Sequence, residues 1–209
     1  MKSARILFVT GTDTGVGKTM CAAFMAYALR TRGVRVAALK PICSGGREDA
    51  HRLHQAGGRV LSLAEVNPWY FRAALAPRLA ARLESKAVQL RAVAAHIRRV
   101  ARRFEVVIVE GAGGLLSPLG ENFDARDLIR TLNAATIVVC PNRLGAVNQV
   151  RLVLAALPPA RRRQARVVLV NPPQISAASR SNPELLGNFV TPQHIFVMPW
   201  LRRSRPAHV

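Results

Sequence analysis

Residues 6–19, ILFVTGTDTGVGKT, run from an apolar segment into a loop of glycine and threonine that ends at Gly17-Lys18-Thr19. The segment Ile6–Val9 predicts a buried strand, and residues 20–29 (MCAAFMAYAL) predict a helix because they are rich in strong helix formers. A loop between a strand and a helix start presents backbone N–H groups to an anion, Lys18 adds positive charge, and the Thr19 hydroxyl suits Mg²⁺. The stretch therefore predicts a nucleotide-phosphate site rather than a chance glycine-rich turn.

This loop departs from the plain G-x-x-x-x-G-K-[ST] pattern. Thr12 stands five residues before Gly17, where the pattern has glycine, and Gly11 is displaced one place toward the strand. Asp13 occupies the position five residues before Lys18, where the partition and division-site ATPases carry a signature lysine. An aspartate cannot supply that positive charge, so the sequence disfavours that class of ATPase.

Length and composition indicate one globular domain over residues 1–209, because half of the residues are hydrophobic and a fifth are charged. No run approaches ~18 consecutive apolar residues, so no membrane span is expected, and the first apolar segment is too short for a signal-peptide core. Cys21, Cys43 and Cys140 are far apart, each beside apolar residues. They are typical of buried thiols in a reducing compartment, and we expect a cytoplasmic protein.

The formal net charge of +20 raises the possibility of a nucleic-acid partner. The densest group, Arg98, Arg99, Arg102 and Arg103, lies on a helix predicted over residues 87–104. The opposite face of that helix carries apolar residues at helical spacing, so we interpret these arginines as a solvated face. Aromatic residues are few, which disfavours a stacking platform for single strands. A nucleic-acid partner is therefore not expected.

Apolar strands and helices alternate along the whole chain. Further strands are predicted at residues 34–39, 106–109, 135–140, 166–170 and 195–198, with further helices near 49–55, 147–157 and 183–189 and an irregular region at 67–79. Helical crossovers between apolar strands predict an α/β fold: a three-layer, doubly wound, mostly parallel sheet of the P-loop NTPase type, with ligands at the carboxyl ends of its strands. Residues 201–209 are expected to form a short basic tail.

Charged residues follow two of these strands. Lys40-Pro41 comes after Leu39, and the proline with Gly45 and Gly46 predicts a loop that directs Lys40 toward the phosphate site. Glu110 follows Val109, where a buried carboxylate is costly unless it binds a cation. With Asp49 and Thr19 it would form a hard-oxygen set for Mg²⁺. A helix N-terminal charge is the alternative role for Asp49.

Several motifs, in order, resemble the dethiobiotin synthetase family. They are GTDTGVGKT (11–19), KPICSG (40–45), VNPWYF (66–71), AP (76–77), VEGAGG (109–114), RLGAVNQ (143–149), VN (170–171) and MPWL (198–201). The resemblance covers nearly the whole chain and implies ATP- and Mg²⁺-dependent ureido-ring closure. In that family 7,8-diaminononanoate takes up CO₂ as a carbamate, ATP phosphorylates the carbamate, and the second amine displaces phosphate to give dethiobiotin.

The resemblance also implies roles for individual residues. Lys18 and Lys40 would be the catalytic cations, and Thr19, Asp49 and Glu110 would hold Mg²⁺. ATP would contact Gly15, Val16, Gly17, Lys18, Thr19, Met20, Asp49, Glu110, Asn171, Pro199, Trp200 and Leu201, with Asn171 reading the base. The diamine substrate would contact Thr12, Ser44, Gly111, Ala112 and Gly113.

The family works as a homodimer with a shared active site, which implies that Leu144, Gly145 and Asn148 hold the substrate carboxylate of the neighbouring subunit. Two features depart from the family pattern: Pro172 follows Asn171 where a second polar residue is usual, and Arg202, Arg203 and Arg205 stand where acidic residues are common. Two other functions stay open on the sequence. They are a P-loop switch ATPase that binds DNA, and a related ATP-dependent amide ligase.

Overall fold

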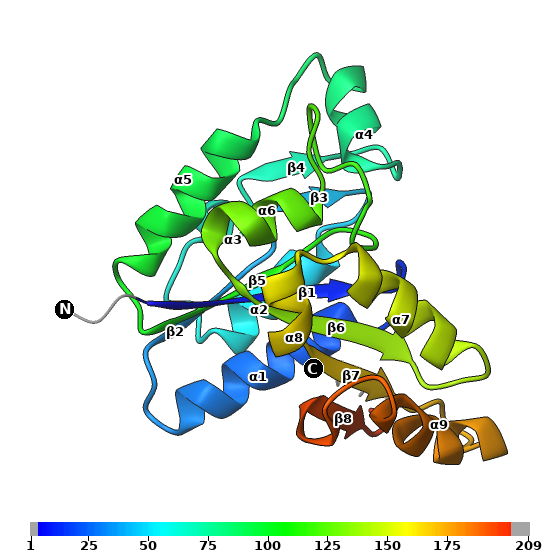
Figure 1. Cartoon of the computed structure of the whole chain (residues 1–209). Helices are drawn as coiled ribbons and strands as arrows, with labels where there is room; N and C mark the ends of the chain where they lie inside the picture. The colour runs from blue at the N-terminus through cyan, green and yellow to red at the C-terminus, as the bar shows by residue number, and fades with distance from the viewer. Residues whose placement is uncertain (1–3, 202–209) are drawn as a thin grey trace, which may run out of the picture.

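A computed structural model describes residues 4–201 and places a parallel sheet at the centre of the molecule (Figure 1). The sheet has six strands in the order β2-β5-β1-β6-β7-β8, and every neighbouring pair is parallel. Its strands are β1 (Arg5–Gly11), β2 (Val36–Leu39), β5 (Val106–Glu110), β6 (Ala135–Pro141), β7 (Arg166–Val170) and β8 (Ile195–Met198). The expected doubly wound, mostly parallel sheet is thereby confirmed.

Helices cover both faces of this sheet. The longer ones are α1 (Lys18–Thr31), α2 (Glu48–Ala56), α5 (Leu90–Ala101), α6 (Ala125–Leu132), α7 (Ala146–Ala156) and α9 (Ala177–Gly187). Figure 1 shows α1 and α2 together on one face, and α5, α6 and α7 on the other. Shorter helices are α3 (Leu63–Val66), α4 (Pro77–Leu83), α8 (Pro159–Gln164) and the 3₁₀ turn Pro192–His194. Parallel neighbouring strands need crossover connections, which here contain the helices of the two outer layers.

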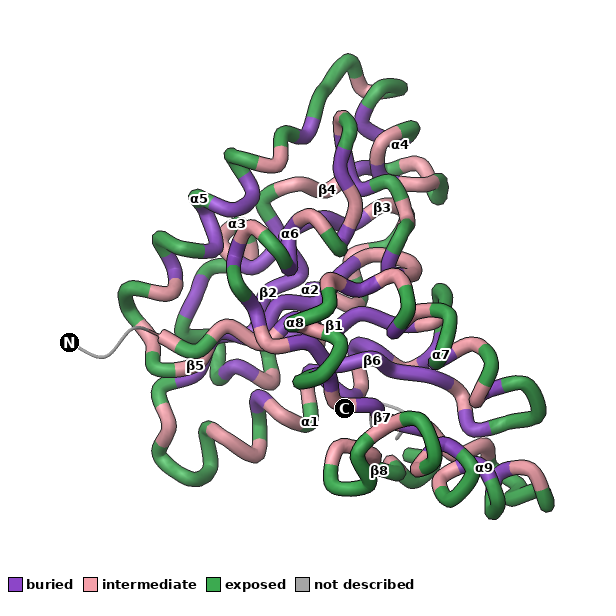
Figure 2. Tube along the Cα trace, viewed as in Figure 1, coloured by how far each residue is buried: buried purple, intermediate pink, exposed green. Residues whose placement is uncertain are grey.

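Burial follows the layers. The central strands lie in the interior, whereas the outer faces of the helices are exposed (Figure 2). The apolar stripe expected on α5 is buried at Val93, Ile97 and Val100, while its arginines are exposed. The three cysteines are buried free thiols, as expected. No helix within residues 4–201 is long and apolar enough to cross a membrane.

The region after β2 differs from the prediction. Instead of a plain loop after Pro41, residues Ile42–Ser44 form β3, which pairs in parallel with β4 (Trp69–Phe71) inside the stretch expected to be irregular. This two-stranded sheet, with α4 beside it, lies next to the main sheet in Figure 1. Each strand has only three residues, so neither shows a readable alternation, and their pairing spans a long loop.

Several helices were not predicted or were misplaced, among them the short α3 and α4 on either side of β4. No helix was expected at α6 or α8. The helix expected at residues 183–189 instead runs from Ala177 to Gly187, with Ser176 as its N-cap and Pro183 inside it. The Ser176 side chain accepts a hydrogen bond from the Ser179 backbone N–H, and this cap starts the helix a turn and a half earlier than Pro183 does. Most of the expected basic tail, from residue 202 onward, lies outside the described residues.

Candidate active site

A cleft of about 1050 Å³ lies at the carboxyl ends of the central strands. Most of the predicted site residues line it: Gly15, Val16, Gly17, Lys18, Thr19, Met20, Lys40, Ser44, Asp49, Glu110, Ala112, Gly113, Asn171, Pro199, Trp200 and Leu201. Parallel strands end together at one edge of a sheet, which explains why residues far apart in sequence meet there. The fold therefore brings the predicted phosphate, metal and base residues into one cleft.

The phosphate loop is shaped by two glycines in the left-handed region. Gly15 has φ of 73° and Gly17 has φ of 100°, values that side chains rarely permit. Gly17 is also the N-cap of α1, so the helix begins at Lys18 with its free backbone N–H groups facing the cleft. The Asp13 carboxylate accepts a hydrogen bond from the Thr14 backbone N–H at 2.6 Å, which gives this acid a local role in the loop.

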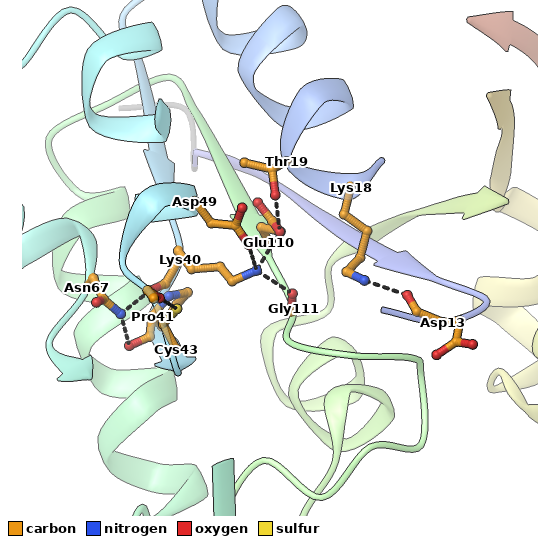
Figure 3. A network of polar contacts seen from close by, with 11 residues as sticks. Asp13, Lys18, Thr19, Lys40, Pro41, Cys43, Asp49, Asn67, Glu110 and Gly111 are labelled. Atoms are coloured by element: carbon orange, nitrogen blue, oxygen red, sulfur yellow. Dashed lines mark hydrogen bonds and ion pairs between the residues drawn. The ribbon is translucent and has the colours of Figure 1, made fainter. Parts of the chain in front are cut away.

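The buried Lys18 folds back onto the same loop. Its Nζ donates to the carbonyl oxygen of Asp13 at 2.6 Å (Figure 3). Burial, and secondarily the Lys40 ammonium, lower the pKa of Lys18 to about 8. A lysine held in this way has lost part of its hydration, so a phosphate anion is a favourable partner for it.

Lys40 and Glu110 form a buried ion pair at the centre of the cleft wall. Lys40 Nζ donates to Glu110 Oε1 at 2.5 Å, to Asp49 Oδ2 at 3.0 Å and to the carbonyl oxygen of Gly111 at 3.2 Å (Figure 3). Burial alone lowers the pKa of Lys40, but the carboxylates of Glu110 and Asp49 more than offset this and raise it above its ordinary value. All three donors of the ammonium are thus in use.

The same carboxylates fit a divalent cation. The Thr19 hydroxyl donates to Glu110 Oε1 at 2.8 Å, while Glu110 Oε2 is buried without a hydrogen-bond partner among residues 4–201. Asp49 lies in the first turn of α2 with its side chain 43% exposed, so it serves both as a helix N-terminal charge and as a contact of Lys40. A hydroxyl, an orphaned carboxylate oxygen and a second carboxylate are hard-oxygen ligands of the kind that Mg²⁺ takes.

Asn67 holds the backbone of Lys40, although sequence analysis assigned it no role. Its Nδ2 donates to the Lys40 carbonyl oxygen at 2.7 Å, and the Lys40 backbone N–H donates to Val66 O at 3.0 Å. Arg47 in turn donates from Nε to Asn67 Oδ1 at 3.1 Å. The only signal in the sequence was an asparagine next to a proline in VNPWYF.

The predicted substrate residues divide into two groups. Ser44, Ala112 and Gly113 line the cleft, and the Ser44 hydroxyl donates to the Leu75 carbonyl oxygen at 2.6 Å. Thr12 and Gly111 do not line it; Gly111 acts through its carbonyl contact with Lys40. The Thr12 hydroxyl is buried without a hydrogen-bond partner among residues 4–201, and its contact with substrate stays a prediction.

The loop expected to hold a carboxylate lies apart from these residues. Gly145 is the N-cap of α7 with φ of 88°, and Leu144 beside it is 84% exposed. Arg143 borders the cleft, whereas Leu144, Gly145 and Asn148 do not line it. These three residues therefore do not contribute to the cleft of their own chain, and another molecule can contact them.

The chain matches known proteins over nearly all of its length. A family model described as an AAA domain matches residues 5–205. The ATP-dependent dethiobiotin synthetase BioD of Anaeromyxobacter sp. (strain K) is 38% identical over 96% of this chain and 94% of that protein. The protein of the same name from Bacillus licheniformis is 34% identical over 97% of this chain and 88% of that protein.

Solved structures agree on the fold. A ParA family ATPase from Chlorobium tepidum has a TM-score of 0.61 at 13% identity, over 96% of this chain and 86% of that one. The signal recognition particle receptor FtsY from Elizabethkingia anophelis, with GDP, has a TM-score of 0.58 at 16% identity; this chain covers 59% of it. At such identities the likeness concerns the fold alone. From the identities to the synthetases over nearly the full length, the chain belongs to the ATP-dependent dethiobiotin synthetase family.

Proposed function

We propose that this protein closes the ureido ring of 7,8-diaminononanoate with CO₂, using ATP, and so forms dethiobiotin in biotin synthesis. The observation that carries the proposal is the convergence of Lys18, Lys40 and the Thr19–Glu110 pair in one cleft of a chain with this family membership. A phosphate loop alone would fit many ATPases. The second buried lysine at the tip of β2, beside the carboxylates, is what suits a phosphorylated carbamate.

The chemistry needs no nucleophile from the protein. One substrate amine adds CO₂ and loses a proton, which gives a carbamate; a carbamate oxygen then attacks the γ-phosphorus, and ADP leaves. The second amine attacks the carbonyl carbon of this mixed anhydride, phosphate leaves, and the ring closes with loss of a proton. The protein must position the reactants and balance the charge that develops on the phosphoryl oxygens.

Lys18 and Lys40 are the cations that we assign to this task. Lys18 begins α1, where helix N–H groups also face the phosphates. Lys40 is fixed by rigid strand backbone and by Asn67, and one of its three present contacts has to yield when it bonds the carbamate. Thr19, Asp49 and Glu110 would hold Mg²⁺, which when bound supplies positive charge to the phosphates.

The remaining assignments place the two substrates along the cleft. Gly15–Met20 bind the phosphates, and Asn171 with Pro199, Trp200 and Leu201 bind the base. Ser44, Ala112 and Gly113 contact the diamine end of the other substrate. Leu144, Gly145 and Asn148 lie outside this cleft, which supports a homodimer in which they hold the substrate carboxylate of the partner. A cytoplasmic location stays a prediction.

One experiment tests the function directly. The purified protein is given ATP and Mg²⁺ with and without diaminononanoate and bicarbonate, and the products are identified by mass. We expect ADP, phosphate and dethiobiotin in equal amounts, and little ADP when the diamine is absent. Rapid ADP release that is independent of the diamine, without dethiobiotin, would contradict the proposal.

A further inference from the structure

At the base end of the cleft, where Asn142 is one of the lining residues, lies a cluster of buried polar side chains that the proposed reaction does not use. Asn142 is fully buried, and Ser179 and Asn182 on α9 are 4% and 5% exposed. Buried amides are costly unless their donors and acceptors are matched. This cluster, the Asn142 cluster, touches the predicted base reader: Asn142 Nδ2 donates to Asn171 Oδ1 at 2.7 Å.

Two backbone carbonyls fix the direction of every amide in the cluster, because a carbonyl oxygen only accepts. Asn142 Nδ2 also donates to the carbonyl oxygen of Ser179 at 2.8 Å, so this end of the Asn142 side chain must be its nitrogen. Asn182 Nδ2 donates to the carbonyl oxygen of Arg143 at 3.0 Å and to Asn142 Oδ1 at 2.8 Å. A flip of either amide would place two acceptors or two donors face to face.

Pro183 explains why the Ser179 carbonyl is available. In a regular helix the N–H of residue 183 donates to the carbonyl of residue 179, four positions earlier. Proline has no N–H, so its place inside α9 frees that carbonyl. Asn142 takes it, and the Ser179 hydroxyl donates back to the Asn142 carbonyl oxygen at 2.8 Å. Asn142 and Ser179 are thus joined by two hydrogen bonds, one in each direction.

The hydrogen bonds of the Asn142 cluster determine how the Asn171 carboxamide is oriented at the cleft. Its Oδ1 must point toward Asn142, and one lone pair on that oxygen remains. Its Nδ2 makes no hydrogen bond with another described residue. An asparagine edge with one acceptor and one donor matches adenine, which offers an amino group beside a ring nitrogen. Guanine offers acceptors at both of these positions, so the same edge is mismatched with it.

We propose that Asn142, held by Ser179 and Asn182, is a positioning residue that makes the site selective for adenine over guanine nucleotides by fixing the carboxamide of Asn171. The inference rests on the proposed function in one respect, namely that Asn171 contacts the base. Asn142 borders the cleft but has no exposed surface, so the inference assigns it no direct contact with the nucleotide.

The test compares the affinities of non-hydrolysable imido analogues of ATP and GTP by calorimetry, with Mg²⁺ and without diamine. For Asn142→Leu we expect the adenine-to-guanine preference to fall by about tenfold, or about 1.4 kcal/mol, while the affinity for the GTP analogue changes less than threefold. Asn188→Leu is the control, because Asn188 ends the same helix and is exposed. If Asn142 contributed only to packing, Asn142→Leu would lower the affinities for both analogues equally, and that result would overturn the inference.

Asn171→Ala separates this inference from the proposed function. If Asn171→Ala abolishes the preference and Asn142→Leu does not change it, Asn171 reads the base and the Asn142 inference is wrong. If Asn171→Ala leaves the preference intact, both the base assignment and the inference fail, while the product assay still decides the ligase activity. Should Asn142→Leu not fold, Asn182→Leu removes the next amide along, and an unchanged preference there also overturns the inference.

Discussion

Lys40 lies at the cleft because it directly follows β2, whose carboxyl end is at the edge of the sheet where the cleft lies. Its partners depend on register: Leu39 pairs with Val109, so Lys40 and Glu110 are the next residues of neighbouring strands. The sequence shows that both strands exist, but strand order and register come from packing of the whole sheet.

Replacement of Lys18 tests the phosphate site. Lys18→Ala removes a charge-assisted contact that strengthens in the transition state. The transition-state stabilisation calculated from kcat/KM should therefore fall by an amount on the order of 2–4 kcal/mol. Lys86→Ala is the matched control, because Lys86 is an exposed lysine paired with Glu84 outside the cleft. Steady-state kinetics with both variants decide it, and turnover of Lys18→Ala within about threefold of wild type would refute the assignment.

Lys40 and Arg143 should give different kinetic signatures. Lys40→Arg keeps the charge, but a planar guanidinium cannot reproduce three contacts made by one ammonium, so kcat should fall sharply while ATP still binds. Arg143 borders the cleft beside the loop that we assign to the substrate carboxylate. Arg143→Lys should therefore weaken substrate binding in the ground state and the transition state alike, which raises the KM for the diamine with a smaller change in kcat. If Lys40→Arg changes KM alone, Lys40 is a binding residue and not a catalytic one.

The two carboxylates beside Lys40 should differ in their effect on stability. Glu110 is 1% exposed, so Glu110→Gln weakens a buried ion pair and should lower the free energy of unfolding by about 3 kcal/mol. The Asp49 side chain is 43% exposed, and Asp49→Asn should cost less than about 1 kcal/mol. Urea denaturation without nucleotide measures both. Equal losses would mean that burial does not set the strength of these pairs.

At the scale of elements, the strands of the main sheet were predictable because each is an apolar run at least four residues long. The helix α6 was missed although its capping box was present, with Asp124 and Asp127 each bonding the other's backbone N–H. The start of α9 was misplaced because Pro183 is typical of a first turn, whereas Ser176 caps the helix earlier. The pairing of β3 with β4 depends on tertiary contacts that no local pattern records.

A second capping box makes the stability of α3 depend on pH. The Ser62 backbone N–H, and secondarily Arg103 on the turn after α5, lower the pKa of Glu65 to about 2 from an ordinary 4.5. A lowered folded-state pKa means that Glu65 stabilises the fold above pH 4.5 and that this contribution disappears as pH falls toward 2. The Glu65 side chain is 33% exposed, so its pair with Arg103 is worth roughly 1 kcal/mol or less.

Glu65→Gln tests this contribution. The variant keeps an acceptor for Ser62 but loses the charge, so its melting temperature should lie below that of wild type at pH 6 and approach it near pH 2. Arg103→Gln should reproduce part of the loss, and the double variant should lose less than the sum of the two. A difference between Glu65→Gln and wild type that does not change with pH would contradict the assigned pKa shift.

At the scale of the whole molecule, the net charge of +20 has to be reconciled with a small-molecule enzyme. On α5 and the turn after it, several arginines are engaged: Arg98 donates to the Thr131 carbonyl, Arg99 contacts His96, and Arg103 pairs with Glu65. These contacts leave the arginines exposed, as a solvated face, and dispersed charge of this kind raises the local concentration of any anion.

Duplex DNA should therefore bind weakly at low salt without acting as a ligand of the active site. Because such binding comes from counterion release, its affinity should fall steeply between about 50 and 200 mM salt. The release of ADP from ATP should not respond to DNA at any salt concentration, whereas diaminononanoate with bicarbonate should stimulate it, since only these substrates fill the cleft beside Lys40. Heparin serves as a control polyanion and should bind with a similar dependence on salt. If DNA accelerates ADP release while the diamine has no effect, the protein is a nucleic-acid-dependent ATPase and the proposed reaction is wrong.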